Sequence, residues 1–281
     1  MVRKLFKNKK LICILALLLV AVIVWIAWGN TALELATVTV TSEDLPEEFS
    51  GYRIAHVSDL HNAELGEGNE KLLALLESAE PDIIAITGDI IDSRRTDVDI
   101  ALDFAEKAVE IAPCYYVTGN HESRVDEDFA KLESGLAALG VTVLRDKAVA
   151  LECGGESILL IGIDDPDLAS AANEVGEKLN TLKDGAEGFT LLLSHRPELF
   201  NTYVGSGIDL VLSGHAHGGQ IRLPFVGGVI APHQGIFPKY DSGLYTSGGT
   251  NMIVSRGIGN SLFPFRVNNR PEVILIELKS K

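Results

Sequence analysis

The stretches RIAHVSDLH, residues 53–61, and DIIAITGDIID, residues 82–92, determine the fold of this chain. Each is a short, mainly apolar run that ends in small and acidic residues. Continuous apolar runs of this length are typical of strands buried on both faces of a sheet. An amphipathic helix pattern, with leucines at 72, 73, 75 and 76, separates the two runs at residues 69–79. This alternation predicts an α/β sheet covered by helices.

The same rhythm continues along the chain. Further strands are predicted at residues 114–118, 141–143, 148–153, 157–163, 190–193, 208–212 and 272–278, and further helices at 98–111, 126–139 and 173–183. The segment that begins at Gly214 is rich in glycine and proline, and no regular element is predicted there before residue 272.

Polar residues follow five of the predicted strands. They form the segments SDLH at 58–61, GDIID at 88–92, GNHE at 119–122, SHR at 194–196 and SGHAH at 213–217. Ligands of open α/β sheets bind outside the carboxyl ends of the strands, so these five segments are expected to converge. A single carboxylate at a strand end is usually a helix cap. Five such segments in this order instead favour a functional site.

The side chains in these segments suit divalent metal ions. Carboxylate, imidazole and amide groups bind manganese, iron and zinc, and no thiolate is among them. An Asp-x-His segment presents two side chains on one face, because alternate residues of an extended chain point the same way. Glycines precede Asp89, Asn120 and His215, where they permit a close approach of the backbone.

This series of motifs resembles that of the calcineurin-like metallophosphoesterases. The resemblance covers residues 51–278 and rests on DLH at 59–61, GDIID at 88–92, GNHE at 119–122, His195 and GHAH at 214–217. It implies an α/β fold of the α+β type, a four-layer αββα sandwich with its site at the strand ends. Segments 214–225, 237–245 and 255–266 are similar to a bacterial membrane-anchored phosphodiesterase branch, which includes enzymes resembling UDP-2,3-diacylglucosamine pyrophosphohydrolase.

The resemblance also implies a set of site residues. One metal ion would be bound by Asp59, His61, Asp89 and His217, and a second by Asp89, Asn120, His195 and His215. His121, oriented by Asp92, would face the phosphate or the leaving-group oxygen as the catalytic residue. The cofactors would be two divalent ions, manganese, iron or zinc, with manganese favoured. A water shared by the two ions would be acidified to hydroxide and attack phosphorus.

Several polar residues outside the ligand set require an interpretation of their own. Arg196 is expected either to contact phosphate or to form an ion pair, and His233 lies in a loop that would flank the site. His56, inside a predicted strand, is expected to be a core residue rather than a ligand. The pair Asp164-Asp165 precedes a proline, which favours a turn.

The N-terminal segment differs from the rest of the chain. Residues 1–10 contain five basic residues and no acid, and residues 11–28 contain no charged residue. With a few flanking residues, the apolar run is long enough to cross about 30 Å of hydrocarbon as a helix. We therefore expect a cytoplasmic basic segment (1–10), a transmembrane anchor (11–28), a linker and lead-in (29–50) and a metallophosphoesterase domain (51–281).

The basic residues before the anchor favour a cytoplasmic N-terminus, which predicts a single-pass protein of the cell membrane with its catalytic domain on the extracytoplasmic side. A cleaved signal peptide is the alternative. The length of the apolar run and the lack of an obvious small-x-small site near Trp28 favour an uncleaved anchor.

The 281-residue chain carries a net charge of −15 at pH 7, which argues against nucleic acid as a partner. The function that fits best is a phosphodiesterase or pyrophosphohydrolase acting on a lipid-linked or cell-wall phosphate ester. Two alternatives stay open: a broad phosphomonoesterase and a non-catalytic metal-binding module of the envelope. The oligomeric state is not predicted.

Overall fold

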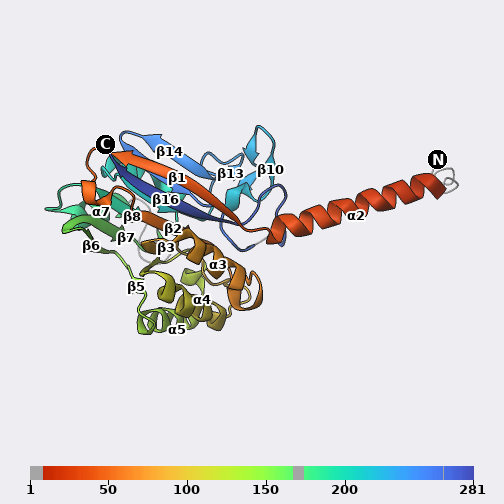
Figure 1. Cartoon of the computed structure of the whole chain (residues 1–281), viewed down its shortest axis with the longest axis horizontal. Coiled ribbons are helices and arrows are strands. Elements are labelled where there is room, and N and C mark those ends of the chain that lie inside the picture. The colour runs from red at the N-terminus through yellow and green to blue at the C-terminus, as the bar shows by residue number, and fades with distance from the viewer. Residues whose placement is uncertain (1–8, 167–173, 262) are drawn as a thin grey trace.

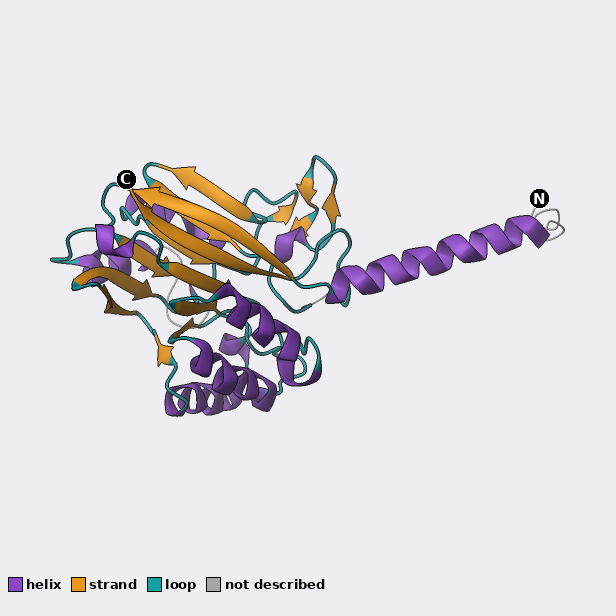
Figure 2. Cartoon of the chain, viewed as in Figure 1, coloured by secondary structure: helices purple, strands orange, loops and turns teal. Residues whose placement is uncertain are grey.

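The computed structural model describes residues 9–166, 174–261 and 263–281 (Figure 1). Two six-stranded sheets form its centre (Figure 2). The first has the order β1 (Glu34–Ser42), β16 (Glu272–Ser280), β2 (Arg53–Val57), β3 (Ile83–Thr87), β4 (Cys114–Val117) and β5 (Thr142–Val143). The second has the order β14 (Gly243–Ser247), β15 (Thr250–Val254), β9 (Leu210–Ser213), β8 (Thr190–Leu193), β7 (Glu156–Gly162) and β6 (Lys147–Cys153).

Helices cover the outer face of each sheet. Helices α3 (Glu70–Ala79), α4 (Val98–Ile111) and α5 (Asp126–Ala138) pack on the first sheet through one apolar cluster. Helices α7 (Val175–Lys183) and α8 (Phe200–Gly205) pack on the second sheet through another. A third cluster fills the space between the sheets. The expected αββα sandwich is confirmed, and the short apolar strands form because both of their faces are buried.

The parallel strands β2, β3 and β4 of the first sheet and β7, β8 and β9 of the second bring their carboxyl ends to one edge of the molecule. Short 3-10 helices connect several elements at Glu47–Phe49, Glu67–Asn69, Glu122–Arg124, Pro197–Leu199 and His217–Gly219. The polar segments predicted from the sequence lie at the edge formed by the carboxyl ends of these strands.

The segment expected as a linker and lead-in, residues 29–50, contains a strand. Strand β1 pairs in parallel with β16 from Glu34↔Glu272 to Ser42↔Ser280 and so belongs to the first sheet. Its sequence, ELATVTVTS, alternates apolar and polar residues as a strand with one buried face does. The strand was not predicted because its pairing partner lies at the other end of the chain.

The glycine-rich segment also contains strands that the sequence did not indicate. The hairpin β14–β15 adds β15 to the second sheet beside β9. Two small hairpins, β10 (Arg222–Leu223) with β11 (Gly227–Gly228) and β12 (Ile230–Ala231) with β13 (Gly235–Ile236), project from the strand-end edge.

Helix α2 (Lys9–Thr31) extends away from the sandwich (Figure 1). It is long and apolar enough to cross a membrane, and none of its residues is buried in the protein. At about 1.5 Å per residue it spans about 34 Å. The predicted basic segment 1–10 lies mostly outside the described residues.

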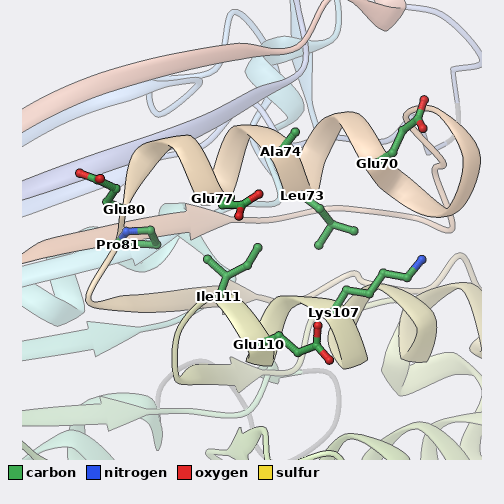
Figure 3. Close-up of a pocket in the computed structure, with 9 residues that line it drawn as sticks. All are labelled: Glu70, Leu73, Ala74, Glu77, Glu80, Pro81, Lys107, Glu110 and Ile111. Atoms are coloured by element: carbon green, nitrogen blue, oxygen red, sulfur yellow. The ribbon is translucent and has the colours of Figure 1, made fainter.

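A groove of about 710 Å³ lies between α3 and α4 (Figure 3). Carboxylates of Glu70, Glu77, Glu80 and Glu110 surround it, with Lys107 as the basic residue of its lining. None of its described lining residues belongs to the polar segments at the strand-end edge, and its carboxylates repel phosphate.

Candidate metal centre

The predicted ligands occupy the turns that follow the strands. Asp59 and His61 follow β2, Asp89 follows β3, Asn120 follows β4, His195 follows β8, and His215 and His217 follow β9. All seven are at most 5% exposed. Five of them have a positive φ: Asp59, His61, Asp89, His215 and His217. Left-handed backbone is unfavourable for residues with a Cβ and is typically retained at functional sites.

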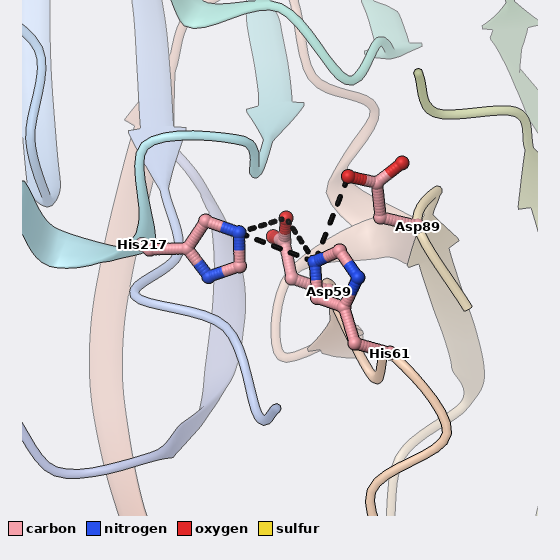
Figure 4. A group of neighbouring side chains, drawn as sticks. All are labelled: Asp59, His61, Asp89 and His217. Atoms are coloured by element: carbon pink, nitrogen blue, oxygen red, sulfur yellow. Dashed lines mark hydrogen bonds and ion pairs between the residues drawn. The ribbon is translucent and has the colours of Figure 1, made fainter. Parts of the chain in front are cut away.

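One group of donors contains Asp59, His61, Asp89 and His217, whose nearest donor atoms lie within 4.8 Å of one another (Figure 4). The Nε2 atoms of His61 and His217 are 3.2 Å apart. His217 Nε2 lies 3.4 Å from Asp59 Oδ1, and His61 Nε2 lies 3.6 Å from Asp89 Oδ2. The four side chains therefore point at a common centre.

A second group contains Asp89, His195 and His215. His195 Nε2 lies 3.2 Å from Asp89 Oδ2 and 3.1 Å from His215 Nδ1. Asp89 thus belongs to both groups, as a bridging carboxylate would.

Asn120 adjoins the second group. Its side-chain oxygen faces His215 Nδ1 at 2.7 Å, and its amide nitrogen faces Arg124. Without a cation, the swapped amide would satisfy both neighbours, because nitrogen would then donate to His215. A cation beside His215 Nδ1 would reverse this preference, since it requires the oxygen. Asn120 therefore stays a predicted ligand.

The buried donors fit a bound cation. The Nε2 atoms of His61 and His217 face each other, and the Nδ1 atom of each ring is buried without a hydrogen-bond partner among the described residues. Buried polar atoms are normally paired, and acceptors that converge on one point require a cation or a proton between them. Oxygen and imidazole donors without thiolate suit manganese, iron or zinc.

Electrostatics favour the metal-binding protonation states for most of the donors. Burial opposes ionisation of Asp89, yet His195 and His61 hold the pKa of its carboxyl well below the ordinary value. Burial, with His195 and Arg196, holds the pKa of His215 well below its ordinary value. Burial lowers the pKa of His195, but Asp89 outweighs it and raises that pKa to about 10. Protonated His195 thus places a positive charge beside Asp89. A divalent metal ion bound there would provide a larger positive charge.

Glu122 holds two of the ligand turns together, a role that the sequence did not assign. Its carboxylate accepts backbone N–H groups from Asp89 (3.0 Å), Ile90 (2.9 Å), Ile91 (3.3 Å) and Gly119 (2.7 Å). Burial, followed by the charge of Asp89, raises the pKa of Glu122 to about 7. In the sequence, this residue is visible as the acid that ends the GNHE segment.

Three glycines allow the turns that carry the predicted ligands to approach one another closely. A Cβ on Gly214 would clash with Ser58 and Asp59, and one on Gly119 would clash with the carboxylate of Asp89. A Cβ on Gly88, where φ is +84°, would lie 2.5 Å from the backbone nitrogen of Gly119. The close approach predicted for these glycines is present.

His121 borders the first donor group, since donor atoms of His61, Asp92 and His121 lie within 4.8 Å of one another. Its Nδ1 accepts the backbone N–H of Ser93 at 3.0 Å. Asp92 Oδ1 is 3.7 Å away from Nδ1, beyond hydrogen-bond distance, and bonds Arg94 instead. Burial lowers the pKa of His121 to about 4, against the raising effects of Asp89 and Asp92. A neutral ring that accepts at Nδ1 carries its proton on Nε2.

Arg196 forms a buried ion pair rather than an exposed one. Its guanidinium donates to both oxygens of Asp165, at 2.5 and 2.7 Å. It also lies 3.2 Å from His215 Nε2 and 2.8 Å from His233 Nδ1. Asp165 therefore does more than occupy the expected turn, and half-exposed His233 flanks the second donor group. His56 is a buried strand residue that bonds Thr87 Oγ1, as expected.

Two buried donor groups that share a carboxylate, at the edge of an αββα sandwich, define a metal-dependent hydrolase. The family described as calcineurin-like phosphoesterase matches residues 52–219, and the chain belongs to this family. The family places the chain among metal-dependent hydrolases of phosphate esters and supports two divalent ions at this site.

Three relatives show how far the likeness extends. The uncharacterised metallophosphoesterase YkuE of Bacillus subtilis is 32% identical over 86% of this chain and 84% of its own length. Phosphodiesterase YaeI of Escherichia coli is 29% identical over 81% and 82%. A transmembrane protein with a metallophosphoesterase domain from Danio rerio is 30% identical over 95% of this chain and 62% of its own length.

Solved structures agree in fold alone. The sulfate thiohydrolase SoxB of Thermus thermophilus superposes with a TM-score of 0.53 at 13% identity, over 84% of this chain and 57% of that one. The protein TT1561, also of Thermus thermophilus, has a TM-score of 0.52 at 13% identity, over 74% of this chain and 91% of that one.

Proposed function

We propose that this chain is a membrane-anchored phosphodiesterase or pyrophosphohydrolase of the cell envelope. Asp59, His61, Asp89 and His217 would hold one divalent ion, and Asp89, Asn120, His195 and His215 the other. The observation that carries this assignment is the position of Asp89, whose Oδ2 lies 3.6 Å from His61 Nε2 and 3.2 Å from His195 Nε2. When bound, the two ions would polarise the phosphate and lower the pKa of a water molecule.

The chain's own residues would bind and orient the ester. A cavity of about 200 Å³ opens over the donors, and Arg94 and Arg124 line it beside His121. Their guanidinium groups would bind phosphate oxygens, since arginine presents several donors in a planar fork. Two arginines thus lie beside the donors in a chain whose net charge is −15.

His121 would assist the leaving group. Ser93 fixes the ring by donating to Nδ1, so the Nε2 proton faces Ser261 Oγ at 3.2 Å on the cavity wall. From there Nε2 would donate its proton to the leaving oxygen, a contribution typically worth about 10²–10⁴-fold in rate. Asp92 would position the loop that carries Ser93 by bonding Arg94, rather than by a direct bond to the His121 ring.

The shape of the site favours diesters. The cavity over the donors adjoins a second cavity of about 300 Å³, and both are lined by His217, Pro232, His233 and Ser261. A phosphodiester carries a substituent on each side of phosphorus, so it needs room beyond the phosphate site. The name of the relative YaeI, a phosphodiesterase, supports the same class.

The test is elemental analysis of the purified full-length chain, combined with hydrolysis of bis-p-nitrophenyl phosphate and p-nitrophenyl phosphate with manganese. We expect two metal ions per chain and faster turnover of the diester. Faster turnover of the monoester would favour a phosphomonoesterase. Bound manganese without turnover of either ester would favour a non-catalytic metal-binding module.

The anchor is part of the proposal. We propose that α2 spans the cell membrane once, remains uncleaved and leaves the sandwich on the extracytoplasmic side. The apolar helix and the transmembrane relatives support this arrangement. Protease added to intact spheroplasts should digest the sandwich and spare α2, whereas a protected sandwich would place it in the cytoplasm.

A further inference from the structure

The end of α2 is bonded to the loop that borders the catalytic cavity. Asn30 accepts the backbone N–H of Arg266 at 2.7 Å and donates to the carbonyl of the same residue at 3.0 Å. Its side-chain oxygen also accepts from Asn260 at 3.2 Å. One residue beyond Asn260, Ser261 Oγ lies 3.2 Å from His121 Nε2. The site is therefore adjacent to the end of the anchor.

The same end of α2 carries groups typical of a membrane–water interface. Trp25 and Trp28 are 46% and 53% exposed, and the guanidinium of Arg270 lies 5.1 Å from the Trp28 ring centre. Tryptophan is enriched at the headgroup level of bilayers. Lys10 and Trp28 are 18 residues apart, about 27 Å along a helix, which is close to the thickness of the hydrocarbon. Asn30 and the loop bonded to it would then lie at the headgroup level.

Several apolar side chains on this side of the sandwich are exposed. Phe225, Val226, Ile236 and Phe237, in the two small hairpins, are each at least 60% exposed. Figure 1 shows β10 and β13 of these hairpins at the end of the sandwich from which α2 leaves. Exposed apolar groups that gather on one face indicate an interaction surface, and the bilayer entered by α2 is the apolar phase adjacent to it.

An apolar groove leads from this face to the donors. Ile230, Ala231, Pro232 and Phe263 line it together with His217, and its volume is about 300 Å³. Ile230 and Phe263 are 38% and 40% exposed. Gln220, which is buried, positions one wall by donating to the carbonyls of Phe263 and Phe265, at 3.3 and 3.2 Å. A groove of this size is at the lower end of the range for ligand sites.

We infer that the hairpin face rests in the outer part of the bilayer that α2 enters, and that the groove binds the hydrocarbon chain of a phosphate-bearing lipid from this bilayer. The inference rests on the proposed function and specifies its substrate class. The chain would lie between Ile230 and Phe263, and the phosphate would reach the donors where the two cavities share His217. A phosphate ester without an apolar substituent would leave this groove unfilled.

The test uses the full chain in phosphatidylcholine nanodiscs with manganese and a series of p-nitrophenyl alkyl phosphates, from methyl to octyl. In each reaction, water supplies the new P–O bond and p-nitrophenolate leaves. Each buried methylene should raise kcat/KM by up to about fourfold. The readout is the octyl-to-methyl ratio, in which a general loss of activity cancels.

Partition of the longer esters into the nanodisc also raises this ratio, so variants are required. Ile230→Asn and Phe263→Asn should each lower the ratio at least tenfold. The matched control Leu244→Asn changes an apolar residue that is 46% exposed on β14, outside the groove, and should keep the ratio. Equal ratios in the wild type and the groove variants would overturn the inference.

A second readout does not depend on turnover. A phosphatidylcholine with a diazirine in its acyl chain should label peptides that contain Phe225, Ile230 and Phe263, and should not label Leu244. Labelling confined to α2 would overturn the inference. Failure to hydrolyse the methyl ester and bis-p-nitrophenyl phosphate would instead contradict the proposed function, so the two failures are distinguishable.

Discussion

The backbone N–H of Ser93 donates to Nδ1 of His121 at 3.0 Å, which leaves the ring proton on Nε2, facing the cavity. This relationship favours a role for His121 as a proton donor rather than as a metal ligand, which is the role proposed above. We expect His121→Ala to retain two metal ions per chain, because no donor atom of either group is removed. Turnover of esters with poor leaving groups should fall about 10²–10⁴-fold.

The matching measurement is manganese content beside kcat for an alkyl diester and for bis-p-nitrophenyl phosphate. The loss should be smaller for the nitrophenyl ester, because nitrophenolate departs without a proton. A parallel loss of metal and of activity would show that His121 is a ligand.

Variants of Asp89 and Asp92 distinguish a metal ligand from a residue that positions its neighbours. Asp89→Ala removes the carboxylate shared by both donor groups and should reduce bound manganese to a minor fraction. Asp92→Ala should retain both ions and lower kcat, since Asp92 bonds Arg94. Plasma emission analysis of the two purified variants decides, and an Asp89→Ala chain that holds two ions would disprove the shared-carboxylate assignment.

Metal removal should destabilise the chain. A ligand that binds only the folded state stabilises it by about 2.7 kcal/mol at a hundredfold excess over Kd. We expect a chelator to lower the melting temperature of the wild type and added manganese to restore it. Asp89→Ala should show neither change, and a wild-type melting temperature indifferent to the chelator would argue against metal ions at this site.

Gly88 tests the contact between the turns after β3 and β4. Gly88→Ala adds a Cβ at a φ of +84°, 2.5 Å from the nitrogen of Gly119. Gly155→Ala is the matched control, with a φ of +94° and open space around its Cβ. Both should lose about 1–2 kcal/mol through backbone strain. Only Gly88→Ala should also weaken manganese binding, as calorimetric titration would show, and equal affinities would contradict this.

Glu122 tests the support of the ligand turns. In Glu122→Gln, an amide group replaces one of the oxygens that accept four backbone N–H groups. Buried donors left without acceptors cost about 1–3 kcal/mol in the free energy of unfolding. Urea denaturation should show this loss, whereas Glu133→Gln, in a partly exposed pair with Arg145, should lose less than about 1 kcal/mol. Equal losses would argue against a special role for Glu122.

The sequence predicted the elements whose signal is local. Strands such as β8 and helices such as α4 match their predicted bounds, because apolar runs and helical periodicity are visible within each segment. It missed β1, whose partner β16 is distant in the chain, and β15, which lies in a glycine-rich segment. Local pattern carries little information about such pairings.

The candidate ligands were predictable for a similar reason, since each follows its own strand and the edge of the sheet gathers them. The supporting contacts were not. Ser93 and Ser261 contact His121 from two different loops, and neither loop has a pattern that indicates this position. Asp92 was expected to orient His121 and does lie beside it, with Oδ1 3.7 Å from Nδ1, but the hydrogen bond to Nδ1 comes from the backbone of the neighbouring Ser93.

Only Ala32 and Leu33 separate α2 from β1, and Arg270 donates to the carbonyl groups of both. Two residues reach at most about 7 Å when fully extended. If α2 spans a bilayer as proposed, this short connection fixes the distance between the membrane surface and the catalytic cavity. Scissile bonds presented far above the headgroups would lie out of range, however well their chemistry matched the site.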